Sequence, residues 1–598
     1  MATIQYPREQ LMDLLSTPGD PLIPLLDDAI DHPEKYRDRT STKLLFEQGA
    51  EKLADIENIS HLTYTTYRNV QRFTDSLPYK TVGEDRRTKM ALAAMKVILG
   101  NEDYLNLLHD YVWVTCEETN WMLPQLDHVG IELRVAATAL SLAEIIVGLS
   151  DKMEDKAKNR VRQEIEDRVF TPYLRHPNGY HWYKGTNNWN GVINSSIGCS
   201  FLLLEKDTER LARALEIVLV GLDAFLEIAF EPDGSSAEGT GYWMYGLSNF
   251  ICFSEMLQNR TLGEIDLLGT DRLKQIAHYP IDVLLSPGHY FPYSDCRENV
   301  GLEPGLVTRL IERTGFDDLR GVIADPAGIS MGLARFHTAW RNTFWWDGVR
   351  PDPISLDDIW LKESDVVRLV SSTAQSAPIT LATKAGHNGV SHNHNDIGSF
   401  VLHVDGETLL CDPESGLYDL YRRHGHDQNL FANSLGHSVP KIGDTLQSRG
   451  KEFGGHITSC DMEGDTKRVE MEITGAYDIP ELKRLQRTIT LKGNMAVIED
   501  HVSFNGDAQN VEEALVVWID PTLDGATARI AGERHQIELT IEEPSDATWS
   551  VESFEEESKA NNKQGILKRL SFNVSGESGR SRIRVRILAQ SKSLLSEP

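Results

Sequence analysis

Apolar residues recur every three to four positions along much of the chain between about residues 40 and 330. This spacing predicts amphipathic helices, each of which buries one face. The clearest runs are 88–99, 131–149, 208–230 and 246–257. Because these runs follow one another with short connections, we expect helices packed against helices over this part of the chain.

The pattern then changes to short β-prone runs. Two prolines near acidic residues in the segment WDGVRPDPISLDD, residues 346–358, indicate a boundary between domains. Strands are predicted within 399–412, 484–504, 514–520, 534–542 and 582–590. The first of these segments has two halves joined across Asp405-Gly406, which is typical of a β-hairpin. Regularly spaced strands of this kind predict a large antiparallel sandwich, so we expect two domains, residues 1–350 and 351–598.

Composition narrows the class of protein. The 598 residues are 40% hydrophobic and 25% charged, as in soluble globular proteins of more than one domain. The formal charge of −30 argues against a nucleic-acid partner, and acidic residues such as Glu144 and Asp223 interrupt the most apolar runs, which argues against membrane spans. The first residues, MATIQYPREQLMDLL, do not resemble a signal peptide, so a cytoplasmic protein is expected.

The segment SHNHNDIGSF, residues 391–400, is the strongest candidate for chemistry. If it is a strand, the alternating residues His392, His394 and Asp396 share one face and can bind a metal ion. Asp412 and His437 are further candidate ligands downstream. Together these groups exceed what one zinc ion needs, which suggests that one histidine is left for proton transfer. The alternative is a hydrated histidine-rich loop with no ligand.

Two polar, aromatic segments lie between the helices. EGTGYWMYG, residues 238–246, contains Tyr242, which can transfer protons if its pKa is lowered from about 10. TNNWN, residues 186–190, offers amides that can bind a carboxylate, and nearby tryptophans can stack on sugar rings. The simpler alternatives are packing at a helix start for the first segment, and turns and caps for the second.

The three segments together, TNNWNGV, DGSSAEGTGYWMYG and SHNHNDIGSFVLHVDGETLLCDPESGLY, resemble the heparinase II/III-like polysaccharide lyases in order and spacing. The resemblance implies an α+β multidomain fold, with an N-terminal incomplete (α/α) toroid followed by a C-terminal antiparallel β-sandwich. It also implies β-elimination on 4-linked uronic-acid glycans such as glycosaminoglycans or alginate. Without a signal peptide, imported oligosaccharides are the expected substrates.

The resemblance assigns roles residue by residue. Tyr242 and His392 match the family's catalytic tyrosine and histidine, and Asn188 matches the position that neutralises the substrate carboxylate. A structural zinc site would be formed by His394, Asp412 and His437, with His424 or His426 as substitutes for His437. No organic cofactor is implied, and a homodimer is an open alternative for the assembly. The residues expected to contact the sugar are Asn187, Trp189, Glu238, Trp243 and Arg297.

Three other functions remain open. A glycoside hydrolase on a helical toroid would use a carboxylate pair such as Asp233 and Glu238, but this leaves the histidine-rich segment unexplained. A non-catalytic carbohydrate-binding protein would hold sugar through aromatic side chains. A zinc hydrolase would hold an open catalytic metal with His392, His394 and Asp396.

Overall fold

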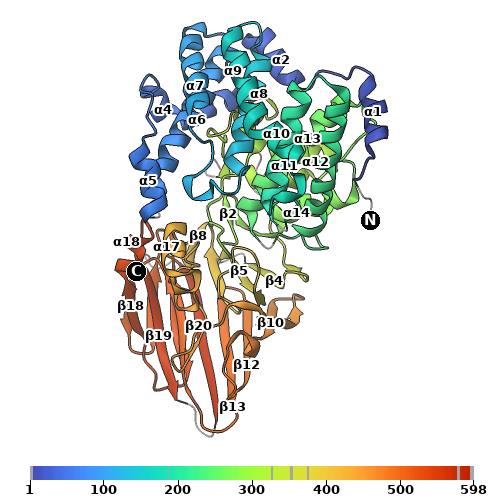
Figure 1. Ribbon diagram of the computed structural model, residues 1–598. Coiled ribbons are helices and arrows are strands. Elements are labelled where there is room, and N and C mark those ends of the chain that lie inside the picture. The colour runs from blue at the N-terminus through green and yellow to red at the C-terminus, as the bar shows by residue number, and fades with distance from the viewer. Residues whose placement is uncertain are drawn as a thin grey trace. The chain divides into compact units, whose positions relative to one another are not determined.

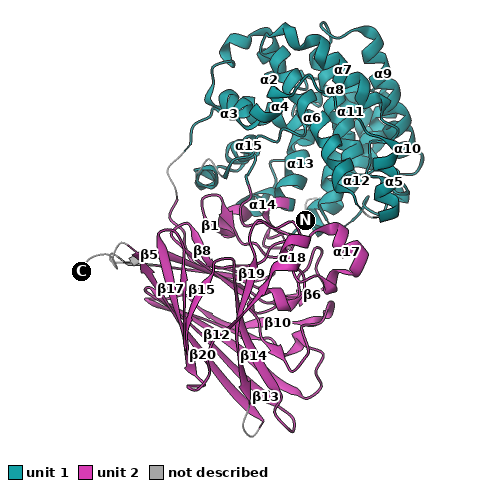
Figure 2. Cartoon of the chain, turned by 90° about the vertical axis from the view of Figure 1, so that its left-hand side faces the viewer, with its two compact units in different colours: residues 1–230, 242–278, 301–352 teal, residues 231–241, 279–300, 353–598 magenta. Residues whose placement is uncertain are grey.

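The chain forms two compact units, which are coloured separately in Figure 2. The computed structural model describes residues 4–73, 75–185, 187–236, 238–324, 328–350, 354–373, 376–575 and 579–592. Unit 1 contains residues 1–230, 242–278 and 301–352, and unit 2 contains residues 231–241, 279–300 and 353–598. Two segments that lie between helices in the sequence, 231–241 and 279–300, therefore belong to the strand-rich unit.

Helices predominate between residues 8 and 344 (Figure 1), as the apolar spacing predicts for residues 40–330. They are α1 (Arg8–Ser16), α2 (Pro24–Asp31), α3 (Thr40–Gln48), α4 (Ala50–Ala54), α5 (Tyr64–Phe73), α6 (Leu77–Ile98), α7 (Leu105–Glu117), α8 (Leu133–Gly148), α9 (Asp155–Ile165), α10 (Thr171–Arg175), α11 (Asn188–Leu204), α12 (Thr208–Ile228), α13 (Thr240–Arg260), α14 (Asp271–Asp282), α15 (Pro304–Thr314) and α16 (Phe336–Phe344). Among the described residues, no helix combines the length and the apolar character needed to cross a membrane.

Helix α11 is central to unit 1, and two glycines explain how its neighbours approach it. A Cβ atom on Gly191 would lie 2.6 Å from the ring of Phe225 in α12, and one on Gly198 would lie 2.5 Å from the ring of Phe253 in α13. Only glycine leaves room for these contacts. Helix α11 also packs against α8. The positions of these helices are therefore fixed by close packing, including the positions of the polar residues in their first turns.

Antiparallel sheets form unit 2. In spatial order, the nine-stranded sheet contains β15 (Pro521–Asp524), β16 (Thr527–Ala531), β17 (His535–Glu543), β20 (Arg580–Ser591), β13 (Met495–Phe504), β12 (Leu482–Lys492), β11 (Thr466–Glu472), β10 (Gly450–Asp461) and β6 (Gly386–Asn388). The five-stranded sheet contains β3 (Ile359–Leu361), β4 (Val366–Thr373), β5 (Ser376–Lys384), β7 (Phe400–Val404) and β8 (Glu407–Leu410), and the four-stranded sheet contains β18 (Ser550–Phe554), β19 (Leu567–Ser575), β14 (Asn510–Val517) and β9 (Lys441–Ile442). Two short strands, β1 (Leu284–Ser286) and β2 (His289–Tyr290), pair separately.

One hydrophobic core holds the three larger sheets together. Along β17 the buried positions alternate with partly exposed ones, as expected for a strand with one face in the core. Side chains from different sheets meet in a single cluster, for example Leu381 of β5, Ile489 of β12 and Leu515 of β14. The predicted class, helices followed by antiparallel strands that pack on one another, is therefore observed.

The hairpin predicted at Asp405-Gly406 is present, but the prediction for the segment before it is wrong. Strands β7 and β8 pair directly at Val404 and Glu407, and both turn residues have positive φ angles, 45° and 85°, as a tight hairpin requires. Residues 391–399, in contrast, form turns and loop, and His392 has a φ of 56°. The three polar residues of this segment therefore do not share one face of a strand.

Candidate active site

His392 is held between two carboxylates of unit 2. Its Nδ1 atom lies 2.9 Å from Oδ2 of Asp295, and its Nε2 atom lies 3.5 Å from Oε1 of Glu238. The hydroxyl of Tyr418, in α17 (Tyr418–His424), lies 2.7 Å from the same Nδ1. The His392 side chain is 21% exposed, whereas that of Asp295 is 1% exposed. The ring is therefore held through Nδ1, while part of the side chain stays accessible to a ligand.

Asp295 is a site residue that the sequence analysis missed. Its Oδ2 accepts a hydrogen bond of 2.6 Å from Tyr418, its Oδ1 lies 3.3 Å from Nε2 of His394, and its backbone N–H donates to the His392 carbonyl at 3.1 Å. Although burial favours the neutral acid, the hydrogen bonds from His392, His394 and Tyr418 hold the pKa of Asp295 well below its usual range. The only sequence signal was its place in the aromatic, glycine-containing loop 286–299.

Asp396 has a different environment from the two histidines. Its Oδ1 accepts a hydrogen bond of 2.6 Å from Nζ of Lys384, and both side chains are buried. This ion pair ties the loop to β5 and explains why Asp396 does not converge with the two histidines. The arrangement does not support an open catalytic metal held by His392, His394 and Asp396.

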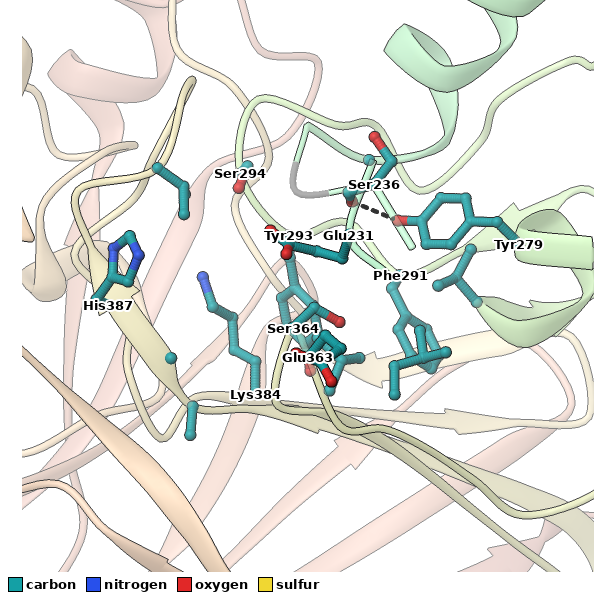
Figure 3. A pocket seen from close by; sticks show the side chains of 17 residues that line it. Glu231, Ser236, Tyr279, Phe291, Tyr293, Ser294, Glu363, Ser364, Lys384 and His387 are labelled. Carbon is teal, nitrogen blue, oxygen red and sulfur yellow. Dashed lines mark hydrogen bonds between the residues drawn. The ribbon is translucent and has the colours of Figure 1, made fainter. Parts of the chain in front are cut away.

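Lys384 also lines a pocket of about 100 Å³ in unit 2. Figure 3 shows the lysine amine between His387 and Tyr293, and the Tyr279 hydroxyl donating to the carbonyl of Ser236. Two of the residues that line this pocket, Gly239 and Ser294, directly follow or precede Glu238 and Asp295 in the chain. The pocket therefore lies next to the carboxylates that hold His392.

His394, Asp412 and His437 come together as a group that can hold a metal ion. Their candidate ligand atoms all lie within 4.8 Å of one another, and all three side chains are buried. Nδ1 of His394 and Nε2 of His437 are buried without a hydrogen-bond partner. Although burial would raise the pKa of Asp412, the two nearby histidines lower it. Buried imidazoles with an unsatisfied nitrogen beside an ionised carboxylate fit a metal site better than a hydrogen-bonded network. His437 fills the third position of this group, and His424 and His426 are outside it.

A second histidine group provides a useful contrast. His289, Glu298 and His403 also lie within reach of one ion. Here the polar atoms already have partners, because His403 contacts Thr408 at 2.8 Å and Ser286 at 2.9 Å, and Nδ1 of His289 lies 2.7 Å from Glu298. Burial lowers the pKa of His403 to about 4, so its ring is neutral at pH 7. This group is satisfied by hydrogen bonds alone.

Two buried arginines position the loop of His437. Arg487 in β12 donates to the carbonyls of Gly398 at 3.0 Å and Ser438 at 2.8 Å, and pairs with Asp500 and Glu513. Arg569 in β19 donates to the carbonyl of His437 at 3.1 Å. Irregular loops have carbonyls with no strand partner, and these guanidinium groups supply the missing donors. The sheets therefore fix the loops that carry His394 and His437.

Unit 1 carries the other predicted catalytic residues at helix starts. Asn188 is the first residue of α11 and is 3% exposed. Tyr242 lies in the first turn of α13, and Gly246, one turn later on the same face, would place a Cβ atom 3.4 Å from the Cβ of Asn188. The packing of α11 against α13 thus brings the first turns that carry Asn188 and Tyr242 to neighbouring positions in unit 1.

The predicted sugar-contacting residues divide by environment. Asn187 caps α11, since its side chain accepts from the Trp189 backbone at 3.2 Å, and Trp189 is half-buried beside His181. Trp243 is 1% exposed and its indole N–H donates to the Ile276 carbonyl at 2.9 Å, so its ring packs in the helical core. The exposed Arg297 lines a cavity of about 550 Å³ in unit 2.

The carboxylates of the hydrolase alternative have separate local partners. Asp233 accepts from the backbone N–H and the hydroxyl of Ser235, at 3.0 Å and 2.7 Å, which is the pattern of a turn. Glu238 instead lies against His392. Two carboxylates with these partners do not resemble a general acid and base poised over one bond.

Known proteins resemble this chain in one stretch of its sequence and in its fold. Residues 355–585 match the family model described as heparinase II/III-like, C-terminal. No curated protein sequence matches the chain. Similar solved structures include heparinase III (TM-score 0.60, 14% identity, 85% of this chain and 76% of that one), heparan sulfate lyase from Pedobacter heparinus (0.56, 13%, 84% and 75%) and chondroitin AC lyase from Streptomyces coelicolor A3 with chondroitin sulphate (0.54, 11%, 92% and 80%).

At these identities the likeness to solved structures shows a shared fold and does not by itself assign a reaction. The family match is independent of that likeness and covers the strands that follow residue 355, together with the loops of His392, His394 and His437. Residues 355–585 are therefore similar to heparinase II/III-like C-terminal domains, which agrees with the family resemblance carried by the histidine-rich segment that begins at residue 391.

Proposed function

We propose that the protein is a polysaccharide lyase that cleaves 4-linked uronic-acid glycans by β-elimination and leaves an unsaturated uronide. The observation that carries the proposal is the double contact of Asp295. Its carboxylate lies beside both His392 and His394, and His394 belongs to the group that can hold a metal ion. A buried carboxylate that orients one partly exposed histidine is a common arrangement for proton transfer. The proposed fold of unit 1 is the incomplete (α/α) toroid, supported by the packed helix pairs α6 with α7, α8 with α9 and α11 with α12.

The reaction begins with removal of the weakly acidic proton on C5 of the uronide. Its loss beside an ionised carboxylate would create a second negative charge, so the carboxylate must first be neutralised. The buried amide of Asn188 at the start of α11 is suited to this role, because it donates hydrogen bonds without bringing a charge into the core. The O4 leaving group then departs and a C4–C5 double bond forms.

Tyr242 and His392 divide the proton transfers in this proposal. Tyr242 protonates O4, and it also removes the C5 proton when that proton lies on the same side of the ring. His392 is the base when the C5 proton lies on the opposite side. In support, Glu238, whose carboxylate lies 3.5 Å from Nε2 of His392, precedes Tyr242 by only four residues. The proposed substrates are imported acidic oligosaccharides, and the proposed location is the cytoplasm.

The first prediction tests the reaction class. Incubation with a panel of glucuronate, iduronate and mannuronate oligosaccharides is expected to produce a product that absorbs in the near ultraviolet, because elimination conjugates the new double bond with the carboxylate. Tyr242→Phe is expected to abolish this absorbance while circular dichroism stays unchanged. New reducing ends without the chromophore would indicate hydrolysis instead, and binding without any product would indicate a carbohydrate-binding protein.

We also propose that His394, Asp412 and His437 bind a structural zinc ion. The burial of all three residues leaves no open position for substrate, so the ion would brace the two loops and take no part in proton transfer. Asp295 then links this brace to His392, because one carboxylate contacts both His392 and His394. The unsatisfied buried ring nitrogens of His394 and His437 support this assignment.

The second prediction concerns metal removal. The purified protein is expected to contain one zinc per chain by elemental analysis, and chelation is expected to lower its melting temperature. A site occupied at about 1,000 times its dissociation constant contributes roughly 4 kcal/mol of stability. His437→Gln is expected to lose the metal, whereas His289→Gln, in the hydrogen-bonded group, is expected to retain it. Equal metal content in both variants, or no metal in the parent protein, would contradict the proposal.

A further inference from the structure

A cavity of about 340 Å³ in unit 1 has on its wall an arginine that forms no ion pair with any described residue. Helices α6, α8 and α13 and the segment 330–336 line the cavity, which includes three arginines, Arg87, Arg134 and Arg335. Among the described residues, no carboxylate oxygen lies within 4.0 Å of the Arg134 guanidinium, and its Nη1 atom is buried without a hydrogen-bond partner. The Arg134 side chain as a whole is partly exposed, so its charge is accessible from the cavity.

The other two arginines have clear structural partners. Arg87 contacts Glu118 at 2.9 Å and also donates to the Thr138 hydroxyl at 2.9 Å. Arg335 pairs with Glu303 at 2.8 Å and lies over the ring of Tyr245, 4.3 Å from its centre. Their charges are satisfied within the protein. Among the described residues that line the cavity, Arg134 is the arginine with no carboxylate oxygen within 4.0 Å.

The surroundings of Arg134 leave space for its guanidinium group. A Cβ atom on Gly83 of α6 would lie 2.2 Å from Nη2 of Arg134, so a larger residue there would displace the group. Glu132 is the acidic group nearest in sequence, but its Oε2 accepts from the backbone N–H of Arg134. Burial raises the pKa of Glu132 to about 7, so much of it is neutral at pH 7. Glu84, which also lines the cavity, is half-exposed and lies 3.8 Å from Lys80.

The cavity adjoins the helix starts that carry the proposed catalytic residues of unit 1. Arg134 lies in the first turn of α8, and α8 packs against α11, which begins with Asn188. The loops before these helices are joined, because the Trp182 indole N–H donates to the carbonyl of Ile131 at 2.7 Å. Tyr245, which lines the cavity, follows Tyr242 by one turn of α13. A sugar chain held at Asn188 and Tyr242 can therefore extend a neighbouring unit toward Arg134.

We propose that this cavity is a subsite in which Arg134 binds the anionic group of a sugar unit next to the one that is cleaved. The subsite rests on the proposed function for its place along the sugar chain, but the anion site itself does not. Guanidinium groups bind both carboxylate and sulfate through paired hydrogen bonds. The net charge of −30 repels acidic glycans at long range. A cation fixed in this cavity would attract such a glycan locally.

The third prediction tests this subsite with Arg134→Gln. The KM for acidic oligosaccharides is expected to rise roughly 10–100-fold, with kcat changed only a few-fold, because a charge-assisted hydrogen bond is lost in both the ground and transition states. Arg134→Lys is expected to recover part of the loss. The exposed Arg320→Gln serves as the matched control and is expected to behave like the parent protein.

Stability separates a binding role from a structural one. Because Arg134 forms no ion pair with a described residue, Arg134→Gln is expected to melt at about the parent temperature. A lower melting temperature with an unchanged KM would show a structural role and overturn the subsite. Oligosaccharides with and without sulfate identify the anion: an effect confined to sulfated chains indicates sulfate, and an equal effect on both indicates the carboxylate.

A direct binding measurement tests the anion site without relying on cleavage of a substrate. Calorimetric titration with free glucuronate and with inorganic sulfate is expected to show binding to the parent protein and a loss of affinity in Arg134→Gln. If no oligosaccharide is cleaved but this difference is seen, the lyase proposal fails and the anion site stands. If cleavage is seen but Arg134→Gln changes neither KM nor binding, the subsite is wrong and the lyase proposal stands.

Discussion

Replacing His392 by alanine is expected to lower kcat roughly 10²–10⁴-fold on uronides whose C5 proton lies opposite the leaving group, the usual range for loss of a general base. Uronides with the proton on the same side are expected to lose much less, because Tyr242 then performs both transfers. The measurement is the initial rate of ultraviolet absorbance on epimeric substrates. An equal loss on both kinds of substrate would contradict this division of roles.

Asp295→Asn is the companion variant for this prediction. Asp295 is 1% exposed at its side chain and touches His392 and His394, so it positions the base without meeting the substrate. We expect kcat to fall while KM stays nearly constant, since an amide holds the imidazole less firmly than a carboxylate does. Asp233→Asn is the matched control, because its turn contact with Ser235 can be kept by an amide and elimination should continue. Loss of activity in Asp233→Asn would favour the hydrolase alternative.

Arg487→Met is expected to destabilise the protein by about 3–5 kcal/mol, the range observed when one partner of a buried ion pair is removed. Arg487 is 0% exposed and lies 2.6 Å from Asp500 and 2.8 Å from Glu513. Its loss leaves two carboxylates in the core and two loop carbonyls without donors. Burial already raises the pKa of Glu513 well above its usual range, so this group is expected to take up a proton in the variant.

Urea denaturation followed by circular dichroism measures this effect, and two further variants define it. Arg468→Met, on the exposed face of β11, is expected to change stability by less than about 0.5 kcal/mol. The triple variant Arg487→Met, Asp500→Leu and Glu513→Leu is expected to recover much of the loss, because it leaves no unpaired charge. A change below about 1 kcal/mol in Arg487→Met would show that water compensates the two acids.

The sandwich therefore does more than carry the site loops. Arg487 and Arg569 reach from different sheets to the carbonyls of Gly398, His437 and Ser438. A destabilised Arg487→Met variant is thus also expected to hold its metal less tightly, since the loop of His437 loses a donor. The proposed zinc would hold these loops through side chains, whereas the two arginines hold them through backbone carbonyls.

Local patterns were sufficient to predict several of the elements. The apolar spacing at 131–149 and 208–230 predicted helices that coincide closely with α8 and α12. Residues three to four apart share one face only in a helix, so this spacing distinguishes a helix from a strand. The Asp405-Gly406 pair predicted the turn between β7 and β8, because few other residues adopt two successive positive φ angles. The family resemblance then identified His394, Asp412 and His437 as one group, although 43 residues of the chain separate the first from the last.

Tertiary structure decided which polar residues meet and what charge each one faces. The alternation of His392, His394 and Asp396 predicted one face of a strand. In the structure His392 has a positive φ, the segment is a loop, and Asp396 pairs with Lys384. Asp295 precedes His392 by about 100 residues, and Arg134 lies in α8 of the other unit. Neither residue belongs to a sequence motif that would have identified it. Periodicity records which side of an element is buried, whereas the partner of a buried charge depends on contacts between segments far apart in the chain.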